Sequence, residues 1–202
     1  MKFNQNSPFL KMITTVIQFI ILNICYILSC IPIVTIGAAT SSLFFVTLRY
    51  ADQEKGYLVT DFFKSMKNNW LQSTLAFFIL FLPAVILIFS GIFWISIKDL
   101  FLTTLVGVVA IIIAFYLLLA LLYSLVLIGR FDTTLKQAIK NALYLPLVET
   151  FRSLIIVIGG ITFFSLITII PGLKIIWILF GFSFVSYCYA FLFLAIFKNY
   201  EE

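Results

Sequence analysis

Histidine is absent from the sequence, and charged residues are scarce. Without histidine the chain lacks the usual proton shuttle of neutral pH and the commonest ligand of transition metals. A Ser-His-Asp or Cys-His catalytic arrangement is therefore impossible, and no Walker or dinucleotide-binding fingerprint occurs. We expect no catalytic residue, no metal site and no cofactor, and the sequence favours a protein that is not an enzyme.

Only 10% of the residues are charged, whereas 63% are hydrophobic and the mean hydropathy is +1.19. This composition is typical of a chain whose solvent is the lipid bilayer. The net charge of +5 does not indicate nucleic-acid binding, because the lysines and arginines flank the apolar runs. The three cysteines, Cys25, Cys30 and Cys188, lie within apolar runs, and we interpret them as small buried hydrophobic residues.

Long apolar runs predict an all-α fold, with residues 1–202 forming one integral membrane domain. Six runs are separated by short polar or proline-containing connections: 12–31, 34–48, 71–97, 100–128, 154–170 and 175–197. The sequence therefore predicts a polytopic bundle of six transmembrane helices. The run 34–48 is only about 22 Å long as a helix, so it forms either a short span or a re-entrant hairpin.

The distribution of positive charge distinguishes these two topologies. If residues 34–48 span the membrane, eleven of the thirteen lysines and arginines are cytoplasmic, and only Lys98 and Lys174 lie outside. If they re-enter, Lys2 and Lys11 move outside, and the split becomes nine to four. The positive-inside rule favours six spans, with both termini on the cytoplasmic side of the cell membrane.

Pro32 interrupts the apolar sequence between the first two runs, because proline lacks an amide hydrogen and restricts the residue before it. The next residues include the hydroxyls of Thr35 and Thr40, and Gly37 opens a face of small residues. At membrane depth such a break requires protein or enclosed water to satisfy the freed backbone groups. We therefore expect another part of the chain to pack against residues 32–42.

An amphipathic segment precedes the third apolar run and another precedes the fifth, over residues 61–70 and 132–143. In the first segment Phe63, Met66 and Trp70 recur on one helix face, with polar residues on the other. Such segments are typical of helices that lie in the membrane interface. The sequence therefore predicts two interfacial amphipathic helices in addition to the six spans.

The second segment begins at Asp132, which is its expected N-cap. An offset of 72 residues aligns Lys64 with Lys136 and Asn69 with Asn141. This alignment indicates a weak internal repeat, since both copies lie directly before a span.

Asn23 lies in the middle of the first apolar run. One interpretation is a hydrogen bond to a neighbouring helix, worth about 0.6 kcal/mol on average and up to about 2 kcal/mol. The other is a polar, solute-facing seam that Asn23 would form with Tyr116, Tyr123, Tyr187 and Tyr189. The hydrogen bond is favoured, because buried tyrosines usually bond to a local partner. The interiors of the assigned spans contain no charged residue, which argues against ion-coupled transport.

Four strings carry a family resemblance: Pro32-Ile-Val-Thr-Ile-Gly-Ala-Ala-Thr40, Gly56-Tyr57, Phe62-Phe-Lys-Ser-Met-Lys-Asn-Asn69 and Arg130-Phe-Asp132. In these strings the chain resembles the YesL-like membrane proteins of Gram-positive bacteria, a family of unknown function. The genes of this family commonly lie beside genes of carbohydrate uptake and polysaccharide degradation. The resemblance therefore implies an accessory role in carbohydrate uptake, with a carbohydrate importer of the ATP-binding cassette class as the partner.

The alternative is a small permease or channel for a sugar-derived solute, with the broken region 30–42 as its path. A water-filled cavity that reaches Asn23 and Gly37 would favour transport, whereas a dry, packed interior would favour the accessory role. The residues that we expect to contact a solute or partner, or to shape such a site, are Asn23, Pro32, Thr35, Gly37, Thr40, Asn69, Arg130, Asp132 and Asn141.

Overall fold

The computed structural model describes residues 8–54, 56–97, 101–170 and 172–200, and every regular element within these ranges is helical. In chain order the elements are α1 (Pro8–Ser29), the 3-10 turn η1 (Ile33–Thr35), α2 (Ile36–Ala51), α3 (Leu58–Ser96), α4 (Phe101–Arg130), α5 (Leu135–Val148), α6 (Thr150–Ile169), α7 (Leu173–Ile176), the π-helical turn η2 (Trp177–Gly181) and α8 (Phe182–Phe197). The elements α7, η2 and α8 follow one another without a break.

Five helical segments of the described chain are long and apolar enough to cross a membrane: Ile33–Ala51, Leu58–Ser96, Phe101–Arg130, Thr150–Ile169 and Leu173–Phe197. Within α1, Ile13–Ser29 is a shorter apolar helix. The prediction of an all-α membrane bundle is thereby confirmed. The connections between runs at Lys98-Asp99 and at Pro171 lie outside the described residues, as does Lys2, and the side chain of Lys11 is also outside them.

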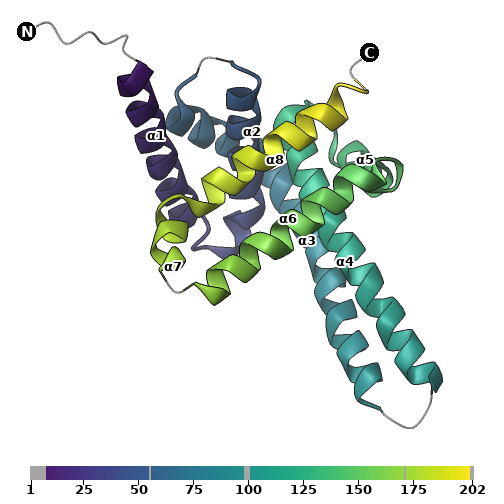
Figure 1. Ribbon diagram of the computed structural model, residues 1–202. Coiled ribbons are helices and arrows are strands. Elements are labelled where there is room, and N and C mark those ends of the chain that lie inside the picture. The colour runs from purple at the N-terminus through teal and green to yellow at the C-terminus, as the bar shows by residue number, and fades with distance from the viewer. Residues whose placement is uncertain (1–7, 55, 98–100, 171, 201–202) are drawn as a thin grey trace, which may run out of the picture.

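The short second run forms the centre of the bundle. Ten of the sixteen residues of α2 are buried, and the helix contacts α1, α3, α4 and α8. Figure 1 shows α2 between α1 and the α3–α4 pair, with α8 crossing in front of it. Small residues at the start of α2 allow this close approach from several sides. The predicted break is also found, since α1 ends at Ser29 and Pro32 is extended, with φ −75° and ψ 122°.

α3 and α4 form a long hairpin that projects from the rest of the molecule (Figure 1). Gly91 and Gly107 allow the two backbones to touch, because a Cβ atom on Gly107 would lie 2.7 Å from the carbonyl oxygen of Gly91. α3 contains 39 residues, which is about 58 Å of helix and more than one bilayer thickness. Pro83 lies inside this helix without ending it.

The separate amphipathic helix predicted over residues 61–70 is not found. These residues form the first part of α3, which begins at Leu58 and runs through the whole third apolar run. The reason is local, since the chain from Leu58 to Leu82 contains no glycine or proline that would end a helix. Of the two predicted interfacial helices, only the second is an element of its own.

That second helix, α5, begins two residues later than Asp132 would place it. Its N-cap is Thr134, whose side chain accepts from the backbone N–H of Gln137, while the side chain of Gln137 accepts from the backbone N–H of Thr134. This reciprocal capping box satisfies two amide groups that the helix leaves free. Asp132 is exposed, so its prediction as the N-cap was wrong.

Candidate functional site

The break between α1 and α2 is covered by hydroxyl groups. The Oγ1 atom of Thr35 lies 2.6 Å from the carbonyl oxygen of Ser29 and 2.8 Å from that of Pro32. From α3, the hydroxyl of Thr74 donates to the carbonyl oxygen of Val34 at 3.0 Å. Protein hydroxyls therefore satisfy the carbonyls of Ser29, Pro32 and Val34 at the break, as irregular backbone at membrane depth requires.

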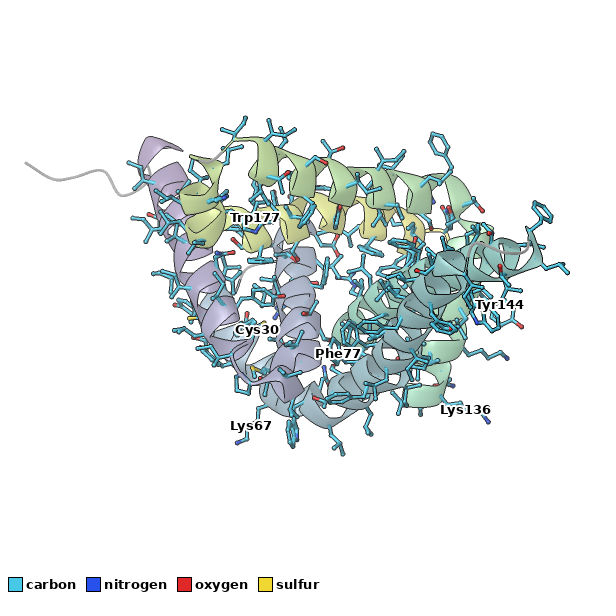
Figure 2. All side chains as sticks on the ribbon, turned by 90° about the horizontal axis from the view of Figure 1, so that it is seen from below. Cys30, Lys67, Phe77, Lys136, Tyr144 and Trp177 are labelled. Carbon is cyan, nitrogen blue, oxygen red and sulfur yellow. The ribbon has the colours of Figure 1, made fainter. Side chains whose placement is uncertain are left out.

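Gly37 lies where α2 packs closely against the backbone of α3. A Cβ atom added at this position would lie 2.5 Å from the carbonyl oxygen of Ser73 and 2.7 Å from the Cβ atom of Phe77. Figure 2 labels Phe77 beside α2. One turn further along α2, the hydroxyl of Thr40 lies 3.2 Å from that of Tyr26 on α1. The predicted packing against residues 32–42 is thus supplied by α1 and α3.

Asn23 is fully buried and bonds to the backbone of the π-helical turn. Its Nδ2 atom donates to the carbonyl oxygen of Ile178 at 2.7 Å, and its Oδ1 atom accepts from the backbone N–H of Ser183 at 2.9 Å. These two backbone groups are five residues apart, which is the spacing of a π-helical hydrogen bond. The side-chain amide of Asn23 therefore bridges the two groups where the backbone departs from α-helical geometry.

The favoured interpretation of Asn23, a hydrogen bond to another helix, agrees with this geometry. The sequence did not predict Ile178 and Ser183 as the partners of Asn23, because no residue pattern in the last apolar run predicts a π turn. The one available signal is Gly181, on which the indole of Trp177 packs so closely that an added Cβ atom would lie 2.4 Å from the ring.

The structure does not assemble the polar seam of tyrosines around Asn23. Tyr123 bonds to the hydroxyl of Ser153 at 2.7 Å, and Tyr189 donates to the carbonyl oxygen of Ile156 at 2.9 Å, both on α6. The hydroxyl of Tyr116 donates to a carbonyl oxygen of α5. The ring of Tyr187 packs on Phe19 and Tyr50. Each of the four rings thus has a local contact.

Two arginines meet near the C-terminal end of α2, the end away from Pro32: Arg49 in the last turn of α2 and Arg130 in the last turn of α4. Arg130, at the end of α4, bonds to Asp52 at 2.8 Å, and its guanidinium lies 3.7 Å from Glu54. Arg49 contacts the same Glu54 at 2.5 Å and Asp61 at 3.4 Å. Partly exposed ion pairs contribute at most about 1 kcal/mol each. We call these five residues the arginine cluster, and its effect is to hold the α2–α3 connection against the end of α4.

The remaining predicted site residues do not meet in one place. Asn69 donates to the carbonyl oxygen of Ile128 at 3.4 Å, which ties α3 to α4. Asp132 and Asn141 are both exposed. The predicted set therefore divides into the helix break near Asn23, the arginine cluster, the region around α5, and Asn69 between α3 and α4.

A cavity of about 380 Å³ lies beneath α5, where α4 and α8 end and α6 begins. Its apolar lining is formed by Leu127, Phe131, Leu145, Val148 and Phe197. Its polar lining is formed by Thr133, Asn141, Tyr144 and Tyr200. Asn141 is the one predicted site residue in this lining. We call this feature the α5 cavity.

A second hollow, of about 350 Å³, lies beside the helix break. It is lined by Tyr26, Ile27, Cys30, Ile31, Ile36 and Phe182. Neither Asn23 nor Gly37 belongs to this lining. We call it the break hollow.

Apolar spans, a break covered by hydroxyls and a buried amide bound to a π turn together define a polytopic α-helical membrane protein. The family described as a protein of unknown function, DUF624, matches residues 19–91. This range contains Asn23, the Pro32 break and most of α3, whereas Arg130 and α5 lie beyond it. The match is consistent with the resemblance to the YesL-like proteins. No curated protein and no solved structure matches the chain.

Proposed function

We propose that this chain is a non-enzymatic membrane protein that acts by binding other proteins, as an accessory component of carbohydrate uptake. The observation that carries the proposal is the closed packing around Asn23 and Gly37. The amide of Asn23 is fully buried and engaged at both polar atoms, and Gly37 touches the backbone of α3. The carbohydrate part and the importer partner rest on the family resemblance alone.

The alternative is a small permease or channel that moves a sugar-derived solute past the broken helix. The observation that favours it is the proximity of two helix irregularities, since the α1 helix that ends at the Pro32 break also bonds through Asn23 to the π turn. Discontinuous helices commonly form the binding sites of transporters, and π turns are frequent at functional sites. The break hollow would be the entrance of such a path.

We expect the accessory protein to pass no sugar by itself. The purified chain, reconstituted into liposomes loaded with radiolabelled mono- and disaccharides, should release them no faster than protein-free liposomes. A tagged chain should co-purify an ATP-binding cassette importer from mildly solubilised native membranes.

Two matched variants distinguish sugar that passes through the break hollow from sugar that leaks unspecifically out of the liposomes. Cys30→Trp would fill the break hollow, whereas Ile33→Trp would place the same bulk on a side chain that is already 66% exposed. Sugar release that increases with protein content, and that only Cys30→Trp abolishes, would replace the accessory proposal with the permease.

The proposed topology has six spans, with α2 crossing the membrane and both termini in the cytoplasm. In a variant that lacks the three native cysteines, Lys174→Cys should react with an impermeant thiol reagent from outside. Lys136→Cys should react only after the membrane is opened. Labelling of Gln5→Cys from outside would establish the re-entrant topology instead, because it would place the N-terminus on the outer side.

A further inference from the structure

The α5 cavity has an apolar interior and a polar rim. Leu127, Phe131 and Phe197 line its inner part, at the ends of α4 and α8, while Asn141 lies on exposed α5. Thr133 also lines it, and the hydroxyl oxygen of this residue is buried without a hydrogen-bond partner among the described residues. A buried hydroxyl without a partner is costly, so the rim can offer a hydrogen bond to a ligand.

Positive charge lies on α5 one helical turn from a lining residue, because Lys140 precedes Tyr144 by four positions. Lys140 precedes Asn141 in α5, and Lys136 lies one turn before Lys140; both are exposed. No ion pair joins either lysine to another described residue, whereas Arg49, Arg130 and Arg152 are all paired with acidic side chains. The arginines thus bind within the protein, and the lysines of α5 remain available to an anion.

The basic surface continues onto the neighbouring helix. The start of α5 lies against α3, where the side chain of Gln72 donates to the carbonyl oxygen of Thr133. Lys64 and Lys67 are exposed on the preceding turns of α3. Figure 2 shows Lys67 and Lys136 pointing away from the molecule on the side opposite α6 and α8.

Exposed apolar side chains accompany these lysines. On α5, Tyr144 and Leu147 are 60% and 63% exposed, and on α3, Trp70 is 49% exposed. Lysines interleaved with exposed aromatic and aliphatic groups are typical of the headgroup level of a bilayer. Because two spans end and one begins beside the cavity, its rim lies at the level where phospholipid phosphates lie.

We propose that the α5 cavity binds an anionic phospholipid. An acyl chain occupies the apolar part against Phe131 and Phe197, and the phosphate lies at the rim beside Lys140, Asn141 and the hydroxyl of Thr133. Basic pockets between membrane helices are known to bind such headgroups. The inference is independent of the accessory role, since it concerns a ligand of the bilayer itself.

The test uses the full chain purified in detergent, with phosphatidylglycerol and phosphatidylcholine as the added lipids. Native mass spectrometry should show phosphatidylglycerol retained in preference to phosphatidylcholine, and its addition should raise the melting temperature more. The double variant Lys136→Gln/Lys140→Gln should bind phosphatidylglycerol about 30-fold more weakly, which is about 2 kcal/mol, at about 1 kcal/mol for each lysine.

Three controls make the result specific. Lys174→Gln removes an exposed lysine at α7 and should leave the preference unchanged. Val148→Trp would fill the cavity and should reduce binding, whereas Leu147→Trp, on the same helix but outside the lining, should not. Inorganic phosphate and glycerol phosphate should not shift the melting temperature, because they lack the acyl chain.

Several outcomes would overturn the proposal. Equal retention of both lipids by the wild-type chain would show that charge has no part in the site. Unchanged binding in Val148→Trp would place the lipid elsewhere. Stabilisation by free phosphate would indicate an anion site without a lipid tail, and stabilisation by an acidic peptide but not by lipid would indicate a protein partner instead.

Discussion

Gly37→Leu is expected to remove most of the folded protein from membranes. A Cβ atom at this position already lies 2.5 Å from a backbone carbonyl of α3 and 2.7 Å from the Cβ atom of Phe77. Neither atom belongs to the flexible end of a side chain, so the larger side chain fits only if α2 and α3 move apart. Overpacking typically costs about 1–3 kcal/mol, and we expect a value at the upper end of this range because α2 is the centre of the bundle.

The measurement is the melting temperature and the monodisperse fraction of each variant in detergent. Gly172→Leu is the matched control, because no heavy atom lies within 4 Å of a Cβ atom added there, and Gly172 has right-handed helical backbone angles. Gly172→Leu should resemble the wild type. A Gly37→Leu protein with wild-type yield and melting temperature would mean that α2 and α3 are separated in the membrane, which would also favour an open path.

Asn23→Leu is expected to lower the melting temperature strongly while keeping the number and branching of the side-chain heavy atoms. The change removes the side chain that bonds both the carbonyl of Ile178 and the amide of Ser183, and no other described side chain bonds both groups. A buried backbone group that loses its partner costs about 1–3 kcal/mol. Because measured hydrogen bonds between membrane helices reach only about 1.7 kcal/mol, we expect a total loss of about 2 kcal/mol.

Two variants provide the comparison. Thr15→Val also removes a hydrogen bond made by α1, that between the hydroxyls of Thr15 and Tyr50 at 3.1 Å, but at a half-buried site, and should cost much less. Ser183→Ala removes the hydroxyl and keeps the backbone amide that Asn23 binds, so its effect should be intermediate. If Asn23→Leu melts at the temperature of the wild type, the π turn is stable without the amide bridge and the bond to α1 is incidental.

Much of the candidate site could be identified from local sequence. Asn23 was conspicuous because an amide in the middle of an apolar run must find a partner. Gly37 was conspicuous because small residues follow a proline break. Neither signal identified the contacting residues, since Ser73 and Ser183 lie 36 and 160 positions away along the chain.

The internal repeat did not predict the structural surroundings of its residues. The weak repeat aligns Asn69 with Asn141, yet Asn69 bonds to the backbone of α4 and Asn141 lines a cavity. Similar strings take different environments because the first copy lies within α3, whereas the second forms a separate helix. Spacing alone cannot distinguish these cases.

By itself the sequence determined that this is an all-α membrane protein, where its apolar helices run, and that the chain breaks at Pro32. These properties follow from hydropathy, run length and the missing amide of proline, which act over a few residues. Only the tertiary structure decided that the short α2 lies at the centre and that Asn23 bridges a π turn. Both features depend on contacts between segments that are far apart in the sequence. The packing of the whole bundle sets which of these segments meet, and local sequence does not contain that information.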